Sequence, residues 1–183
     1  GYFLDNELEW FGRTAGGSEN GLFIEIMKLP ENHSAKRALI EFLKKCYNNK
    51  ISSFNKAWQL KCANWSQVAA FKQLPACNSR ARLDQRKFLE IVGEKYFGTL
   101  AAAIRKADPN HLLLGSRFAG NAPEWAWRSA GKHCDVISFN MYPWLDLETG
   151  NTDELRQRIW HFYRLAKRPM MITEWSFLGL DAG

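Results

Sequence analysis

Two glutamates stand where the chain could carry out acid–base and nucleophilic chemistry. Glu7 ends the short apolar run that opens the sequence, and Glu174 lies in the apolar run MMITEW near its end. Two carboxyl groups can cleave a glycosidic bond, because one protonates the leaving oxygen while the other attacks the anomeric carbon or activates water. Acids at strand ends also cap helices or pair with arginine, so spacing alone leaves a structural role equally open.

Other polar residues accompany these glutamates in strand-like runs. Because side chains alternate along a strand, every second residue of a run shares a face. The predicted faces contain Phe3, Asp5 and Glu7; Ser138, Asn140 and Tyr142; and Met170, Ile172 and Glu174. A layer of carboxylates, an amide and a phenol is costly to bury without partners, so the pattern indicates a site.

The elements that must position these residues alternate along the chain. Apolar runs predict strands at 1–7, 111–118, 135–143 and 170–175. Helical spacing predicts helices at 34–48, 53–60, 66–74, 84–106, 123–131 and 153–166, with Ser34, Ser53, Ser66 and Asp84 as candidate caps or first residues. This order favours an α/β fold with a parallel sheet, either doubly wound or closed as a (β/α)₈ barrel, which four strands cannot complete. No phosphate-binding glycine loop follows a strand, which disfavours the nucleotide-binding form.

Composition narrows the classes of function. The 183 residues are 46% hydrophobic, which is typical of a folded domain, and no apolar run is long enough to span a membrane. The net charge of +6 is spread over several predicted helices, which favours solvated surfaces over nucleic-acid binding. No CxxC pair or zinc-ligand spacing involves the four cysteines, so no metal site is expected, and they stay open as free or paired. The first ten residues lack the features of a signal peptide, so any targeting segment is expected upstream.

Four segments carry a resemblance to a known family. In order along the chain they read GYFLDNELEW, LLLGSRFAG, DVISFNMY and RPMMITEWSF. These segments resemble clan A of the retaining glycoside hydrolases, and they are closest to β-agarases of the family 50 type and to the β-galactosidase-like enzymes around them. The resemblance covers most of the chain and is weak only from about residue 12 to residue 85. The resemblance implies that residues 1–183 form the C-terminal portion, about strands four to seven, of a (β/α)₈ TIM barrel whose missing half belongs to the same chain.

The resemblance also implies roles for the residues at the predicted strand ends. Glu7 is expected to be the general acid/base, with Asn6 hydrogen-bonding the sugar 2-hydroxyl, and Glu174 the nucleophile. Tyr142 is expected to touch the nucleophile, where a phenol donor stabilises the ionised carboxylate. The alternative for Tyr142 is an aromatic residue that only packs in the barrel wall.

Further residues are expected to line a sugar site. Arg117 and Asn140 fall at strand ends, where Arg117 either binds the nucleophile or a sugar hydroxyl, or pairs with Asp5. Trp10, Trp144 and Trp175 each follow a strand end, where an indole can stack on a pyranose ring; ordinary packing is the alternative for all three.

These expectations define a function. They describe a retaining hydrolase that cleaves β-galactosidic linkages in agarose-type polysaccharide by double displacement, without a metal or cofactor. The alternatives are an exo-acting β-galactosidase of the same clan and a carbohydrate-binding barrel without activity. A polysaccharide or oligosaccharide is the expected partner, with no nucleic acid and no membrane, and this substrate class suggests a secreted or periplasmic protein. Four strands leave sheet edges open, so the chain alone is expected to aggregate or bind hydrophobic dye.

Overall fold

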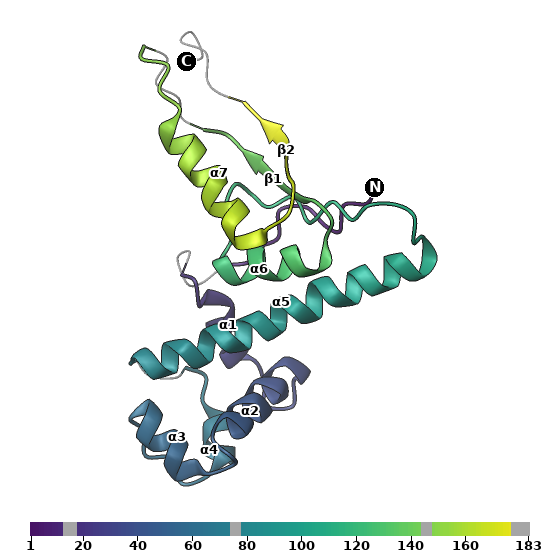
Figure 1. Cartoon of the computed structure of the whole chain (residues 1–183). Coiled ribbons are helices and arrows are strands. Elements are labelled where there is room, and N and C mark those ends of the chain that lie inside the picture. The colour runs from purple at the N-terminus through teal and green to yellow at the C-terminus, as the bar shows by residue number, and fades with distance from the viewer. Residues whose placement is uncertain (13–17, 74–77, 144–147, 177–183) are drawn as a thin grey trace. The chain divides into compact units, whose positions relative to one another are not determined.

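The structure is a computed structural model of the chain, and it describes residues 1–12, 18–73, 78–143 and 148–176 (Figure 1). It divides into two compact units. Unit 1 consists of Gly1–Glu9 and Gly93–Gly183, and unit 2 of Trp10–Val92. The long helix α5 (Ser79–Ala107) contributes residues to both.

Unit 2 is helical in the residues described. It contains α1 (Gly21–Lys28), α2 (Ser34–Cys46), α3 (Ile51–Trp58), α4 (Trp65–Ala70) and the first part of α5. Its core includes the large side chains of Phe23, Leu39, Leu43, Phe54 and Trp58, each at most 4% exposed. Burial of these apolar surfaces stabilises the unit.

The predicted helix caps in unit 2 are wrong in detail, although α2 begins at Ser34 as expected. Helix α2 is capped by His33, whose Nδ1 accepts from the Ala35 amide, and α4 by Asn64, whose side chain accepts from the Gln67 amide. Helix α3 begins after Lys50 without a side-chain cap, and α5 begins at Ser79. Which polar side chain reaches the first amide groups depends on the local backbone, and several neighbouring residues qualify by type.

Two predicted roles in unit 2 also change. Asp84 does not open a helix: it lies buried inside α5 and accepts hydrogen bonds from Tyr47 and from Trp58 Nε1, the latter at 3.1 Å. Helix α1 was not predicted, because its sequence GLFIEIMK is apolar along most of its length and lacks a side-chain cap. A short apolar run of this kind is equally compatible with a strand.

Unit 1 contains a parallel pair of strands, each preceded by a helix. Strand β1 (Ile137–Met141) follows α6 (Glu124–His133), and β2 (Met170–Trp175) follows α7 (Asp153–Ala166). Figure 1 shows β1 in green and β2 in yellow side by side. The predicted strands at 135–143 and 170–175 and the helix at 153–166 are confirmed.

The two other predicted strands form only isolated parallel bridges. Tyr2 pairs with Leu113, and Phe118 pairs with Phe139 of β1. The backbone explains why the pairing is not continuous, because φ is +81° at Gly115 and +43° at Arg117. Residues in this left-handed region cannot continue a strand. The four segments nevertheless follow one another in parallel, in the order of the sequence.

An aromatic core supports this arrangement in unit 1. It is formed by the buried rings of Phe97, Phe118, Trp127, Phe139 and Phe162. The rings of Trp127 and Phe162 stack with centroids 4.2 Å apart and an interplanar angle of 10°. Phe139 comes from β1 and Phe162 from α7, so this cluster fixes the helix against the strand.

A β-bulge interrupts the register between β1 and β2. Phe139 lies opposite Ile172, but the next residue, Asn140, lies opposite Glu174. Thr173 is therefore the extra residue of β2. The prediction that Ile172 and Glu174 share a face by strict alternation is wrong, because a bulge re-aims the side chains that follow it.

Candidate active site

The ends of the four parallel segments meet through backbone hydrogen bonds in unit 1. The Glu7 amide donates to the Arg117 carbonyl at 3.2 Å, and the Asn140 amide donates to the Phe118 carbonyl at 2.7 Å. Asn140 in turn lies opposite Glu174 in the strand pair. The two glutamates therefore reach the same edge although 167 positions (174 − 7) separate them in the sequence.

A buried amide joins the two carboxyl groups. Asn140 is fully buried, and its Nδ2 donates to Glu7 Oε1 at 2.7 Å. The Asn140 side chain also hydrogen-bonds the carboxylate of Glu174. One amide group thus contacts both carboxyl groups and holds them near each other.

Glu174 is held in its ionised form. The Tyr142 hydroxyl donates to Oε2, and the Arg117 guanidinium donates to Oε1. The hydrogen bond from Tyr142 is the largest cause that lowers the pKa of Glu174, and the charge of Arg117 and the bond from Asn140 add to it, outweighing desolvation. The same contact raises the pKa of Tyr142, so the proton stays on the phenol. An ionised carboxylate of this kind can act as a nucleophile.

Two residues of this cluster have unusual backbone conformations. The φ angle is +51° at Glu7 and +43° at Arg117, a region that residues with a Cβ seldom adopt. Hydrogen bonds stabilise the backbone at both residues. Ser138 Oγ accepts from the Arg117 amide at 3.0 Å, and the Glu7 amide donates to the Arg117 carbonyl. Strain that the surroundings maintain is concentrated at functional sites in proteins.

The two alternatives for Arg117 are resolved by its contacts. Its guanidinium binds Glu174 and lies 5.7 Å from the centre of the Phe3 ring. Asp5 is engaged elsewhere, because it accepts from the Tyr96 hydroxyl at 3.0 Å and from the Asn6 amide at 2.9 Å. Arg117 is therefore a partner of the glutamate and not of Asp5.

The remaining predicted site residues differ in exposure. Trp175 follows Glu174 directly and is 66% exposed, and Asn6 is exposed beside Glu7. Trp10 is 6% exposed and belongs to the core of unit 2, so its predicted stacking on a sugar is wrong and the packing alternative describes it. Trp144 lies outside the described residues.

Sequence reasoning missed three residues that support the cluster. The Thr173 hydroxyl group donates to the Asn140 side chain. The Ser138 hydroxyl group accepts from the backbone amide of Arg117. The Tyr96 hydroxyl group donates to Asp5. Tyr96 lies within the helix predicted at 84–106, where no feature of the sequence marks it, and Ser138 is expected only on the polar face of its strand. No feature of the sequence marks Thr173, because strict alternation would place its side chain on the other face of the strand from Glu174.

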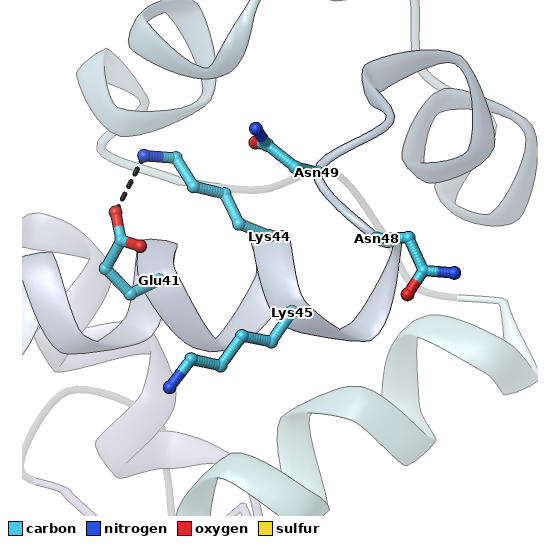
Figure 2. Close-up of a pocket in the computed structure, with 5 residues that line it drawn as sticks. All are labelled: Glu41, Lys44, Lys45, Asn48 and Asn49. Carbon is cyan, nitrogen blue, oxygen red and sulfur yellow. Dashed lines mark hydrogen bonds and ion pairs between the residues drawn. The ribbon is translucent and has the colours of Figure 1, made fainter.

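A separate polar pocket lies in unit 2. It has a volume of about 460 Å³, and Figure 2 shows the residues that line it, which are Glu41, Lys44, Lys45, Asn48 and Asn49. Lys44 Nζ lies 2.7 Å from Glu41 Oε1. Glu41 is the one acid among these residues, and it is already paired to a lysine, so this pocket lacks the two carboxyl groups that cleavage of a glycosidic bond requires.

The described ranges contain neither a metal-binding cluster nor a membrane-spanning helix. No group of three or more His, Cys, Asp and Glu side chains there is arranged to hold a metal ion. Cys46, Cys62 and Cys134 are free thiols, while Cys77 lies outside these ranges. No helix in the same ranges is long and apolar enough to cross a membrane.

The chain is similar to several known proteins along its whole length. β-Agarase B of Vibrio sp. (strain JT0107) is 31% identical over 188 residues, covering 100% of this chain and 18% of the relative. β-Agarase A of the same organism is 29% identical over 196 residues, covering 100% of this chain and 19% of the relative. The chain therefore spans about a fifth of the length of these curated relatives.

Solved structures give the same result. The crystal structure of an agarase has 31% identity and a TM-score of 0.79, covering 98% of this chain and 24% of that one. An exo-β-agarase structure has 27% identity and a TM-score of 0.80, covering 99% of this chain and 24% of that one. These matches confirm the resemblance that the four sequence segments indicated.

A family model assigns the chain directly. The glycoside hydrolase family 42 model, described as β-galactosidase, matches residues 29–176, which include β1, β2 and Glu174. Since the match covers most of the sequence, the chain belongs to this family of glycoside hydrolases.

Proposed function

We propose that the complete protein is a retaining glycoside hydrolase that cleaves β-galactosidic linkages in agarose-type polysaccharide. The observation that carries this proposal is the pair of glutamates linked by the Asn140 amide, with Glu174 held ionised by Tyr142 and Arg117. The names of the relatives, β-agarases, support the substrate class.

The reaction proceeds in two displacements. In the first, the carboxylate of Glu174 attacks the anomeric carbon, the glycosidic C–O bond breaks, and the protonated carboxyl group of Glu7 gives its proton to the leaving oxygen. In the second, the Glu7 carboxylate takes a proton from water, whose oxygen attacks the anomeric carbon and releases Glu174 as a carboxylate. Each step inverts the anomeric centre, so the overall reaction retains its configuration. The scheme requires no metal or organic cofactor.

The surrounding residues have roles in binding the substrate. Asn6 lies next to Glu7 in the sequence and is exposed, which suits a hydrogen bond to the sugar 2-hydroxyl. Trp175 presents an exposed indole on which a pyranose ring can stack, and Trp144 is proposed for the same role. Tyr142 and Arg117 orient Glu174, while Asn140 orients both acids.

The fold that suits this function is the C-terminal portion, about strands four to seven, of a (β/α)₈ TIM barrel. Residues 1–183 then form part of one catalytic barrel. The other strands of that barrel belong to the same polypeptide in the complete protein. The parallel order of the four segments supports this, as does the position of both acids at the carboxyl ends of their segments, where such barrels carry their active sites.

A single substitution tests the proposal. In the complete protein, Glu174→Gln removes the nucleophile with little change in shape, so we expect agarose hydrolysis to fall by at least about a thousandfold. Agarose binding should be kept. The matched control is Glu9→Gln, which neutralises an exposed glutamate two positions after Glu7 and should leave the rate unchanged. Unchanged hydrolysis in Glu174→Gln rules the mechanism out.

A second candidate function is an exo-acting β-galactosidase. The family model that matches the chain is described as β-galactosidase, which favours this reading of the same two acids. Product analysis on agarose and on an aryl β-galactoside separates the two. Oligosaccharides released from agarose support the first proposal, and galactose released only from the aryl glycoside supports the second. Binding of agarose with no hydrolysis of either compound identifies a carbohydrate-binding barrel without activity.

A further inference from the structure

The hydroxyl group of Thr173 contacts the residues that hold both glutamates. Its Oγ1 lies 2.8 Å from Asn140 Oδ1, 3.3 Å from the Phe139 carbonyl and 3.4 Å from Arg117 Nε. Arginine can only donate, so the hydroxyl oxygen accepts from Arg117. Its single proton is then available to the nearer of the two acceptors, which is Asn140 Oδ1.

This contact determines which way the Asn140 amide points. Because Oδ1 receives the proton of Thr173, the Nδ2 group is turned toward Glu7 Oε1, to which it donates at 2.7 Å. Asn140 is fully buried, so bulk water does not replace a missing partner. Without the hydroxyl group, the buried Oδ1 loses its closest donor, and the amide is then held only through the bonds of its nitrogen to the glutamates.

The β-bulge makes the contact possible. Under strict alternation Thr173 and Glu174 would project to opposite faces of β2. Arg117 instead contacts both residues, and Asn140 does so as well. Bulges of this kind recur beside active sites, where they re-aim a side chain.

We propose that Thr173 is a positioning residue, which fixes the amide orientation of Asn140 and thereby holds Glu7 in place to protonate the leaving oxygen. The proposal rests on the function proposed above and adds a residue to its machinery. Thr173 touches neither the substrate nor the breaking bond, and it acts through Asn140.

The effect of losing the hydroxyl group depends on the leaving group. A sugar leaving group is a poor one, so its departure needs the proton from Glu7, whereas a dinitrophenolate departs without protonation. A general defect in folding or in the nucleophile slows both substrates alike. The ratio of the two effects therefore reports on proton transfer from Glu7.

The experiment compares Thr173→Val with the wild type in the complete protein. The kcat/KM is measured on an agarose oligosaccharide and on a dinitrophenyl β-galactoside. For Thr173→Val we expect a loss of about tenfold on the oligosaccharide and less than about twofold on the dinitrophenyl glycoside. Thr173→Ser restores the hydroxyl group and should recover most of the lost rate. Thr152→Val is the matched control, because Thr152 precedes α7 without a side-chain capping bond, and it should leave both rates unchanged.

Equal losses on the two substrates, or no loss on either, overturn the role of Thr173. Circular dichroism checks the fold of each variant, and Thr173→Ala replaces Thr173→Val if the latter does not fold, with the same expectation. Glu174→Gln is measured beside them. Activity kept in Glu174→Gln overturns the proposed function itself, whereas an inactive Glu174→Gln with an unaffected Thr173→Val overturns only the further inference.

Discussion

At the scale of single residues, the proposed nucleophile depends on donors that come from two neighbouring segments. Asn140 lies in β1 and Tyr142 directly follows it, while Arg117 belongs to the extended segment 111–118. All three stabilise the charged form of Glu174, so they favour the state in which it can attack. The hydrogen bond from Tyr142 lowers the pKa of Glu174 the most.

Removal of the Tyr142 hydroxyl group should make the reaction more sensitive to acid. In Tyr142→Phe the largest cause that lowers the pKa of Glu174 is lost, so that pKa rises. A smaller fraction of Glu174 is then ionised at any acidic pH, and the acidic limb of the kcat/KM profile moves to higher pH. The profile of the complete protein on agarose oligosaccharides measures this shift.

The matched control for this prediction is Tyr163→Phe, which removes the hydroxyl group of an exposed tyrosine on α7. Its pH profile should coincide with that of the wild type. An acidic limb of Tyr142→Phe that stays in place, or that moves to lower pH, contradicts the prediction.

The site was predictable where a polar residue ends an apolar run. Glu7, Glu174 and Tyr142 stand out in this way, and their order along the chain matches the resemblance to glycoside hydrolases. The position of Thr173 was not predictable, because a bulge depends on how two strands pair and MMITEW reads as a regular strand by itself. Trp10 was misread, since an indole after a strand-like run suits either a sugar face or a core.

At the scale of elements, the approach of α6 to α7 sets where β2 begins. Gly131 of α6 lies against the last residue of α7, and a Cβ added there would be 2.0 Å from the Ala166 carbonyl oxygen. Arg168 Nε donates to the Gly131 carbonyl at 2.8 Å, two residues before β2 starts. This close packing fixes the position of the backbone just before β2, the strand that carries Glu174.

Filling this space should destabilise the protein. Gly131→Ala forces the backbone of α7 to move, because a carbonyl group cannot rotate away as a side chain can, and we expect a loss of about 2–3 kcal/mol in the free energy of unfolding. Urea unfolding of the complete protein, followed by tryptophan fluorescence, measures this change in free energy.

Gly150→Ala serves as the comparison for this variant. There the added methyl group meets nothing within 4 Å, although φ is +64°. Only the left-handed backbone opposes the change, at a cost of about 1 kcal/mol. A Gly131→Ala variant that is no less stable than Gly150→Ala contradicts the close packing of α6 and α7.

Elements with a long apolar stripe were predictable, and short or irregular ones were not. The helix at 153–166 was expected and observed with the same bounds, whereas α1 and the starts of α3 and α5 were not expected where they occur. The segments at 1–7 and 111–118 have strand-like sequences, yet the positive φ at Glu7 and Arg117 limits their pairing. Those conformations arise from contacts made in the folded unit, which the sequence of either segment does not contain.

At the scale of the whole molecule, the chain carries both acids within unit 1 and spans about a fifth of the length of its curated relatives. The same chain also exposes apolar residues of β2. Met171 is 37% exposed, Ile172 41% and Trp175 66%, while β1 pairs with one edge of the strand. Exposed apolar strands are templates for association with other chains.

The 183-residue chain by itself is therefore expected to associate and to bind a hydrophobic dye. Ile172→Lys should reduce both dye fluorescence and the mass measured by sedimentation, because an edge lysine must be desolvated when a second strand pairs there. Leu112→Lys is the control, since Leu112 is 54% exposed but lies outside β1 and β2, and it should leave the mass unchanged. A monomeric chain that melts cooperatively and does not enhance the dye contradicts this expectation. Equal effects of the two lysines assign the association to general hydrophobicity, whereas an effect of Ile172→Lys alone identifies β2 as the surface that other parts of the complete protein cover.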